Sequence, residues 1–245
     1  MDKVKIMAIG GAKLKEIKKT LIQTTKVGMK LSQIEAEAQK LIEEAGGQAS
    51  FAMVPGYSWA TCINLNSGLV HGIPDDKVIK DGDVVSIDVG IYFKGYHTDT
   101  SFTFIIGKPD DYQEKKKFLE TGEKALNLAI KQAKVGKHIG HISRAMQETV
   151  EKEGYNVARN LTGHGISTTL HHQPMIPCYL EEDVKSTPVI EEGLTIAIEI
   201  IYMQGSSDTI TDKKDGWTIA TKDGKLAGMF EHTVAVTKNG PVILT

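Results

Sequence analysis

Two segments of the chain repeat one pattern of apolar and polar positions. Residues 27–46, VGMKLSQIEAEAQKLIEEAG, align without a gap on residues 135–154, VGKHIGHISRAMQETVEKEG, and six of the twenty positions are identical. In both segments apolar side chains recur every three or four residues, which predicts an amphipathic helix. Ser32 and Glu35 have the spacing of a capping box near the start of the first helix, and a glycine ends each segment.

Later segments match in the same order. Residues 81–89, DGDVVSIDV, align on residues 192–200, EGLTIAIEI, and Asp99 in DTSF aligns on Glu231 in EHTV. Runs of β-branched and other apolar residues such as these are typical of buried strands. The common order indicates an internal duplication with halves of about 1–107 and 108–245.

Each half is therefore predicted to contain two helices followed by several strands. The expected helices lie near 11–26, 31–45, 110–134 and 139–153, and the expected strands run through about 58–106 and from about 156 to the end. Two similar halves packed about an approximate two-fold axis would bring their corresponding strands together at the centre. We expect an α/β (α+β) fold with an antiparallel sheet core, helices outside and pseudo-two-fold halves.

Composition and charge are those of an ordinary globular protein. Of 245 residues, 40% are hydrophobic and 24% are charged, and the formal net charge is −2, so neither a nucleic-acid nor a membrane partner is expected. Lysines at 13, 15, 18 and 19 have helical spacing and are interpreted as a solvated helix face. No apolar run is long enough for a signal peptide or a membrane span. Cys62 and Cys178, without a Cys-x-x-Cys pairing, favour free thiols in the cytoplasm, although one disulfide stays open.

Two carboxylates interrupt the apolar strands. Asp88 lies in VVSIDVGIYF and Glu199 lies in TIAIEIIYM, and both runs are expected to be buried on both faces. An unpaired carboxylate in such a place costs on the order of several kcal/mol and normally takes up a proton instead. Neither strand offers a group that neutralises the charge. We therefore interpret both carboxylates as metal ligands.

Strand geometry adds two further carboxylates. A two-residue turn at Lys94–Gly95 makes Asp99 a diagonal neighbour of Asp88. Glu231 interrupts the apolar strand MFEHTVAV, and the alternation of side chains sends His232 to the opposite face. Structural salt bridges or edge strands are the alternative explanation for any one of these carboxylates. Four of them, related in pairs by the repeat, favour a metal site.

His164, which lies between two glycines in LTGHGI, adds a nitrogen donor. The glycines allow the backbone to come close to a ligand. One imidazole added to four oxygen donors suits Mn, Fe, Co or Zn better than Ca or Mg.

Several motifs together resemble the methionine aminopeptidases. They are VHGIP at 70–74, Ile87-Asp88 with Asp99-Thr100, GHGI at 163–166, Ile198-Glu199, DGWT at 215–218 and EHT at 231–233. The likeness runs in register from about residue 57 to 245. Only 28 positions separate His171 from Glu199, which leaves no room for the helical insertion of the type II enzymes. The chain thus resembles a short type I enzyme with the duplicated pita-bread fold.

The resemblance implies a metalloaminopeptidase with a single catalytic domain over residues 1–245 and two divalent metal ions. Asp99 and Glu231 would bridge both ions. Asp88 would complete one ion, and His164 and Glu199 would complete the other. The substrate would be the N-terminal methionine of a peptide or nascent chain, and we expect the enzyme to act as a monomer.

The same resemblance implies how the substrate is held. Glu199 would shuttle a proton, His171 would stabilise the oxyanion, and His71 would contact the substrate near the scissile amide. The methionine pocket would be lined by Tyr57, Cys62, Leu170 and Trp217, and by Phe51 and Val54, for which a plain core role is an equal alternative. The sequence departs from the family pattern at Ser167, Leu170, His172 and Ile200, none of which is a metal ligand.

Two other functions stay open. A related X-Pro aminopeptidase or prolidase shares the five-ligand pattern but usually carries a large amino-terminal domain. A non-catalytic, metallopeptidase-like binding protein typically loses ligands, whereas all five are present in this sequence. Cleavage of Met-Ala-Ser against Xaa-Pro peptides tests the first alternative, and metal analysis with an activity assay tests the second.

Overall fold

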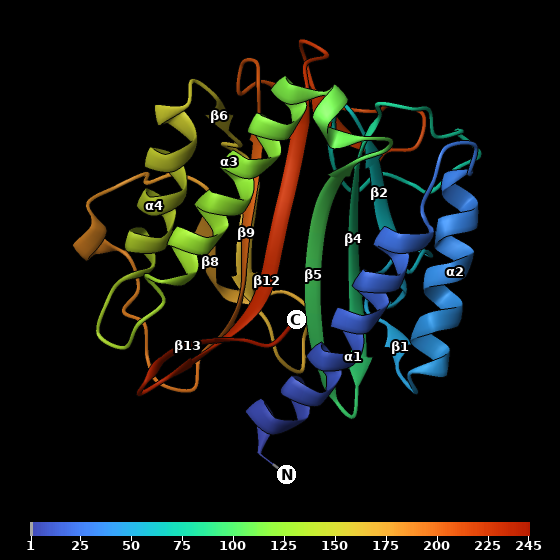
Figure 1. The fold of residues 1–245 in the computed structure, drawn as a ribbon. Coiled ribbons are helices and arrows are strands. Elements are labelled where there is room, and N and C mark those ends of the chain that lie inside the picture. The colour runs from blue at the N-terminus through green and yellow to red at the C-terminus, as the bar shows by residue number, and fades with distance from the viewer. Residues whose placement is uncertain (1) are drawn as a thin grey trace.

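Two halves of the chain meet along their central strands (Figure 1). This computed structural model describes residues 2–245. The first half contains α1 (Lys3–Thr24), α2 (Leu31–Glu44), β1 (Gln48–Ala49), a 3-10 turn at Phe51–Met53, β2 (Thr61–Leu65), β3 (Gly68–Val70), β4 (Val84–Phe93) and β5 (Tyr96–Ile105). In Figure 1, α1 and α2 cover one face of this half.

The second half repeats this order with longer connections. It contains a 3-10 turn at Pro109–Asp111, α3 (Gln113–Ile130), α4 (Ile139–Lys152), β6 (Asn156–Val157), β7 (Thr162–Gly165), β8 (His172–Pro177), a 3-10 turn at Val184–Ser186, β9 (Thr195–Met203), β10 (Thr209–Thr211), β11 (Ile219–Thr221), β12 (Ala227–Thr237) and β13 (Gly240–Ile243). Helices α3 and α4 cover the face that corresponds to the one under α1 and α2 (Figure 1).

All of the strand pairs are antiparallel, as the sequence predicts. In the first half β4 lies between β2 and β5, with β1 paired to one end of β4. In the second half the strand order is β13-β12-β9-β7-β8, with β6 beside β9. A small sheet of order β10-β11-β3 joins the two halves.

Threonine side chains join β5 to β12 at the centre of the molecule. Thr233 Oγ1 accepts a hydrogen bond from the Asp99 amide at 2.8 Å and donates to the Asp99 carbonyl at 2.9 Å. Thr100 Oγ1 donates to the Glu231 carbonyl at 2.8 Å. The corresponding strands of the two halves therefore lie side by side, which confirms the predicted central meeting of the repeats (Figure 1).

The duplication is also visible in equivalent hydrogen bonds. The Gly28 amide donates to the Ile79 carbonyl at 2.9 Å, and the Gly136 amide donates to the Ile190 carbonyl at 2.9 Å. Gly28 and Gly136 occupy the same position of the two aligned segments, 108 residues apart. Each half thus begins its second helix from the same anchored turn.

Helix α1 begins at Lys3, well before the predicted start near residue 11. The glycine pair at 10 and 11 is unfavourable to a helix, but here it allows close packing. A Cβ added at Gly11 would lie 2.2 Å from the Leu244 carbonyl oxygen, and one at Gly10 would lie 3.3 Å from Phe93 Cβ. Tertiary contact with β4 and the C-terminal segment therefore outweighs the low local propensity. Helix α3 likewise ends at Ile130, before the predicted end near 134.

The predicted capping box at Ser32 and Glu35 is wrong. Ser32 Oγ donates to the Asp76 side chain at 2.7 Å, and the helix begins one residue earlier, at Leu31. Gln33 Oε1 instead accepts from the Lys30 amide at 2.9 Å. Glu35 is buried and contacts the strand region below the helix, so a tertiary interaction takes the place of the local one.

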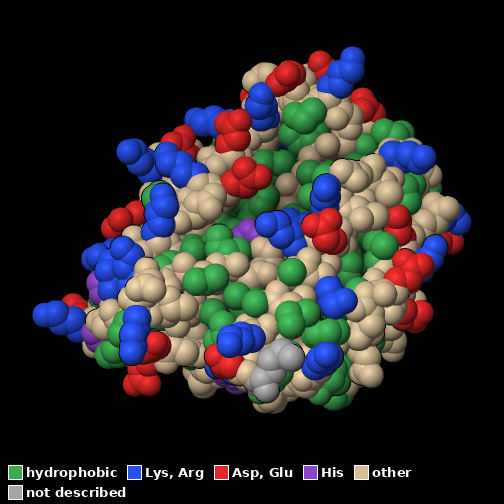
Figure 2. All heavy atoms as spheres, turned by 60° about the horizontal axis from the view of Figure 1, so that its bottom comes forward, with side chains coloured by type: hydrophobic (Ala, Val, Ile, Leu, Met, Phe, Trp, Pro, Cys, Tyr) green, Lys and Arg blue, Asp and Glu red, His purple; other side chains and the backbone are tan. Residues whose placement is uncertain are grey.

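The face seen in Figure 2 carries lysines interspersed with carboxylates and apolar side chains. Lys15 and Lys19 are exposed, while Lys13 and Lys18 are half-buried and place their ammonium groups over Phe93 and Phe102. In the part of the chain from residue 2 onward, none of the helices combines the length and the apolar character that a membrane span needs. The cysteines, Cys62 and Cys178, are buried free thiols, which resolves the disulfide left open by the sequence.

Candidate metal centre and substrate cavity

Two hairpin-like pairs of long strands position the four carboxylates. In the β4–β5 pair, Gly90 lies opposite Asp99 and Asp88 lies opposite Ser101, which confirms the diagonal relationship of Asp88 and Asp99. In the β9–β12 pair, Glu199 lies directly opposite Glu231. The threonine bonds between β5 and β12 then bring the two pairs together across the centre.

A cavity of about 340 Å³ lies between the halves. It is lined by all five predicted metal ligands, Asp88, Asp99, His164, Glu199 and Glu231, by His71 and His171, and by Phe51, Val54, Tyr57, Cys62 and Trp217 of the predicted pocket. Leu170 does not line this cavity. It is buried in the hydrophobic cluster behind it, with Ile166 and Ala197 among its neighbours.

Three of the predicted ligands are already close enough to share an ion. Asp99, His164 and Glu231 each offer a donor atom, and these atoms all lie within 4.8 Å of one another. His164 Nδ1 contacts the Gly165 carbonyl oxygen at 3.0 Å, which leaves Nε2 as the free donor, 3.9 Å from Glu199 Oε1. The backbone contact therefore fixes which imidazole nitrogen faces the carboxylates.

Several carboxylate oxygens at this centre lack a hydrogen-bond partner. Among residues 2–245, no side chain or backbone group bonds to Asp88 Oδ1, Asp99 Oδ1 or Glu231 Oε1, although all three atoms are enclosed. Buried polar atoms are normally paired. Orphaned carboxylate oxygens that converge with a free imidazole nitrogen fit a divalent cation, because the cation supplies the missing positive charge and occupies the empty acceptor sites.

The pKa values of the four carboxylates also favour a cation at this centre. Burial raises the pKa of the Asp88 carboxyl to about 7. Burial and then the neighbouring carboxylates raise the pKa values of Asp99, Glu199 and Glu231 well above their usual range. Without a cation the cluster is forced to retain protons, whereas bound metal would favour the ionised carboxylates.

The cavity histidines are held in their neutral form. Burial, and then the neighbouring His171, lowers the pKa of His164 to about 4 and also lowers the pKa of His71. Burial lowers the pKa of His171 itself, whose ring lies edge-on to His164 with 4.4 Å between centroids. A neutral imidazole keeps one N–H donor and one lone pair, so His164 can ligate a metal and the other two can donate to a substrate.

His71 is placed by an uncommon backbone conformation. Its φ is 56°, in the left-handed region that non-glycine residues rarely adopt. It directly follows β3, and the next residue, Gly72, accepts a hydrogen bond from the Ile63 amide at 2.8 Å. A strained residue fixed at a cavity wall is typical of functional positions.

Two departures from the family pattern contact each other. Ser167 Oγ lies 3.1 Å from His172 Nε2, and the Ser167 carbonyl accepts from the His97 amide at 2.7 Å. These contacts brace the loop between β7 and β8, which carries His171. Ile200 is fully buried in the core of the second half. The departures therefore affect the support of the cavity, and the predicted metal ligands are unaffected by them.

Six further residues line the cavity that the sequence patterns do not predict. They are Val70, Asn160, Leu161, Thr162, Ile201 and Met229. Ile201 and Met229 lie two positions from Glu199 and Glu231, so the alternation of strand side chains was a usable signal. The segment 160–162 lies around the start of β7, and no local pattern indicates that it reaches the cavity.

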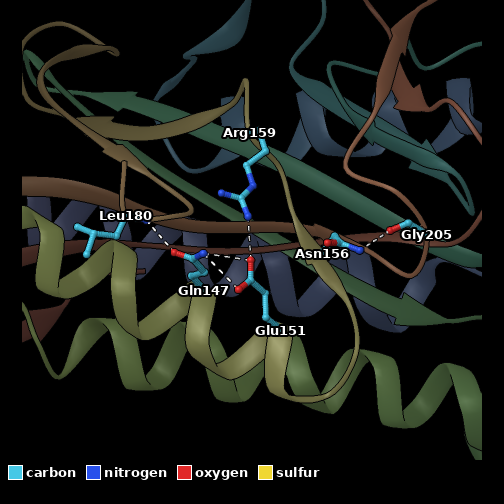
Figure 3. A network of polar contacts seen from close by, with 6 residues as sticks. All are labelled: Gln147, Glu151, Asn156, Arg159, Leu180 and Gly205. Atoms are coloured by element: carbon cyan, nitrogen blue, oxygen red, sulfur yellow. Dashed lines mark hydrogen bonds and ion pairs between the residues drawn. The ribbon is translucent and has the colours of Figure 1, made fainter. Parts of the chain in front are cut away.

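A polar network holds that segment in place (Figure 3). Arg159 Nη2 pairs with Glu151 Oε1 of α4 at 2.8 Å, and Gln147 Nε2 donates to the same oxygen at 3.1 Å. The Arg159 guanidinium also lies over the Tyr179 ring, 4.4 Å from its centroid. These contacts are partly solvated and add little stability, but they hold Arg159, the residue directly before the segment 160–162, against α4 and Tyr179.

Comparison with known proteins shows the family to which this chain belongs. The model of metallopeptidase family M24 matches residues 5–238. The chain belongs to metallopeptidase family M24. Within M24, it is 41% identical to a methionine aminopeptidase of Aquifex aeolicus over 94% of this chain and 91% of that protein, and 38% identical to methionine aminopeptidase 1 of Bacillus subtilis over 90% and 87%. The predicted resemblance is thus confirmed.

Solved structures of M24 members agree. The crystal structure of a methionine aminopeptidase from Thermotoga maritima superposes with a TM-score of 0.94 at 34% identity, over 99% of this chain and 96% of that one. A prolidase from Pyrococcus furiosus gives a TM-score of 0.79 at 23% identity, and the chain covers only 63% of it. The second likeness shows the fold alone. The predicted pita-bread architecture of this metalloenzyme family is confirmed.

Proposed function

We propose that this protein is a dinuclear metalloaminopeptidase that removes N-terminal methionine from peptides and nascent chains. The observation that carries the proposal is the convergence of four buried carboxylates and a neutral imidazole on one cavity, with carboxylate oxygens that have no partner within residues 2–245. Relatives named methionine aminopeptidase over nearly the whole chain support the substrate. Both halves supply ligands, so residues 1–245 act as one catalytic domain.

Asp88, Asp99, His164, Glu199 and Glu231 would hold the ions. Four carboxylates with one imidazole suit Mn, Fe, Co or Zn. Divalent ions bound there would supply a nucleophile by lowering the pKa of water and would polarise the scissile carbonyl. Asp99 and Glu231 would lie at the centre of this ligand set, because hydrogen bonds of Thr233 and Thr100 hold their two strands side by side.

The remaining groups bind the substrate and move a proton. Glu199, whose pKa burial raises well above its usual range, would take a proton and pass it to the leaving amine. His171 would donate its N–H to the developing oxyanion, and His71 would donate to the substrate near the scissile amide. Tyr57, Cys62 and Trp217 would enclose the methionine side chain with apolar and polarisable surface.

Free buried thiols are compatible with a reducing compartment, so we place the enzyme in the cytoplasm, where nascent chains are available. We also propose that the enzyme acts as a monomer, because one chain supplies all five candidate metal ligands together with His71 and His171.

Peptide profiling tests the proposal. Purified protein is loaded with Mn, Fe, Co or Zn in turn and incubated with Met-Ala-Ser, Leu-Ala-Ser and Met-Pro-Ser, and release of the first residue is followed by mass spectrometry. We expect Met-Ala-Ser to be cleaved at least about tenfold faster than Leu-Ala-Ser. Glu199→Gln should retain part of its metal but lose turnover by about 10³-fold. Bound metal without cleavage of any peptide would contradict the proposal and favour a binding protein.

A further inference from the structure

Glu35 of α2 is a buried carboxylate that the metal centre does not use. Its side chain is enclosed, with 6% of its surface exposed, and it points from the helix toward the segment that leads into β2. It accepts four hydrogen bonds. Oε1 accepts from the Ala60 amide at 2.7 Å and from Gln39 Nε2 at 2.7 Å, and Oε2 accepts from the Thr61 amide at 3.0 Å and Thr61 Oγ1 at 2.5 Å.

These bonds fix the backbone between two residues of the cavity wall. Tyr57 and Cys62 both line the cavity, and residues 60 and 61, which Glu35 holds, lie between them. Tyr57 closes the loop on itself, because its hydroxyl donates to the Thr61 carbonyl at 2.8 Å. The Tyr57 ring packs edge-on against Trp59 and Trp217, with 5.1 Å between centroids in each case.

The same segment is coupled to the carboxylates by strand register. Cys62 lies opposite Asp88 in the β2–β4 pair, and Thr61 lies opposite Val89. Glu35 therefore holds β2 at Thr61, one residue before Cys62, which lines the cavity. None of its hydrogen bonds within residues 2–245 reaches a metal ligand, and its side chain does not line the cavity.

The second half offers an internal comparison. Ser143 of α4 occupies the aligned position of Glu35, 108 residues later, and it is also buried. A serine side chain is too short to reach from the helix to the strand below it. Its hydroxyl also cannot accept four hydrogen bonds as the Glu35 carboxylate does. The carboxylate thus occurs only in the half of the repeat that supplies Tyr57 and Cys62.

We propose that Glu35 is a positioning residue for substrate recognition, which holds the Tyr57–Cys62 wall in the shape that receives the N-terminal side chain. The kinetic consequence of this role rests on the proposed function. Glutamine at position 35 keeps the size of the side chain but replaces one acceptor oxygen with a donor. The Thr61 amide would then face an N–H group and lose its partner inside the protein.

The kinetic test compares Glu35→Gln with the wild type and with Glu43→Gln, an exposed glutamate on the same helix. With Met-Ala-Ser as substrate, we expect KM to rise about tenfold in Glu35→Gln, kcat to change less than about threefold and bound metal to stay unchanged by elemental analysis. Thr61→Val, which removes only the hydroxyl bond, should raise KM about two- to threefold. Glu43→Gln should match the wild type.

Two kinetic results would overturn the proposal. One is a KM in Glu35→Gln within twofold of the wild type. The other is an equal loss of kcat and metal, which indicates a general structural role. Near-UV circular dichroism tests the positioning role independently of the proposed function. The spectrum reports the packing of Tyr57 against the tryptophans and does not require the protein to cleave a peptide. We expect the spectrum to change in Glu35→Gln and to match the wild type in Glu43→Gln. An unchanged spectrum in Glu35→Gln refutes the positioning role even if the wild type cleaves no peptide.

Discussion

Replacement of Asp88 with asparagine is expected to stabilise the metal-free protein at high pH. Asp88 Oδ1 is enclosed and has no hydrogen-bond partner within residues 2–245. Burial raises the pKa of its carboxyl from 3.8 to about 7. Asparagine keeps the shape of the side chain but has no ionisable group. The variant therefore avoids the free-energy cost of charging a buried carboxylate without a cation.

The size of the effect follows from that pKa. A rise from 3.8 to about 7 corresponds to roughly 4 kcal/mol between the protonated and ionised states. Water entry and relaxation reduce this value, so we expect about 1–3 kcal/mol.

The sign of the pH dependence follows from the same values. Since the pKa of Asp88 is higher in the folded protein than in the unfolded chain, folded protein holds an extra proton between these two values. The stabilisation is fully present below about pH 4 and is lost as the pH rises through about 7.

Urea unfolding of chelator-treated protein at pH 5 and pH 8 measures this difference. Relative to its value at pH 5, the free energy of unfolding at pH 8 should fall less in Asp88→Asn than in the wild type, by about 1–3 kcal/mol. Added Mn should reverse the order at pH 8, because the wild type binds the ion more tightly and is stabilised by mass action. Asp111→Asn, at an exposed carboxylate, serves as the control.

The reasoning is refuted if metal-free Asp88→Asn is destabilised equally at both pH values. That outcome would show that the carboxylate has a favourable partner in the folded protein, and the orphaned oxygens would lose their significance as a sign of a cation site.

Three further predictions concern the cavity and the packing around it. His71→Ala should lower kcat by about 10²-fold while metal content, measured by elemental analysis, stays near that of the wild type; loss of both ions would contradict the assigned role. Trp217→Ala should raise KM for Met-Ala-Ser about tenfold through lost apolar contact, and an unchanged KM would remove Trp217 from the methionine pocket. Gly122→Ala should reduce the free energy of unfolding by about 2 kcal/mol in urea titrations, because its Cβ would lie 2.5 Å from the Tyr202 hydroxyl, whereas Lys124→Ala on the exposed face should not.

The sequence by itself determined the strand carboxylates and the repeat. Side-chain alternation has a period of two, so a carboxylate in an apolar strand is assigned to a face as soon as the strand is recognised. The tight turn at Lys94–Gly95 set the register of β4 and β5, and with it the neighbours Asp88 and Asp99. These features depend on residues close in sequence, and for that reason they could be predicted.

Contacts between distant segments were decided by the tertiary structure. Leu170 lies behind the cavity instead of at its wall, and residues 160–162 reach it from a connection with no regular pattern. Helix α1 extends through Gly10 and Gly11 because Phe93 and Leu244 pack closely against them. The spacing of Glu35 suggested a local cap, yet its carboxylate bonds to Ala60 and Thr61. In each case the partner lies far away in sequence, and the free energy of burying the group together with that partner outweighs the local preference.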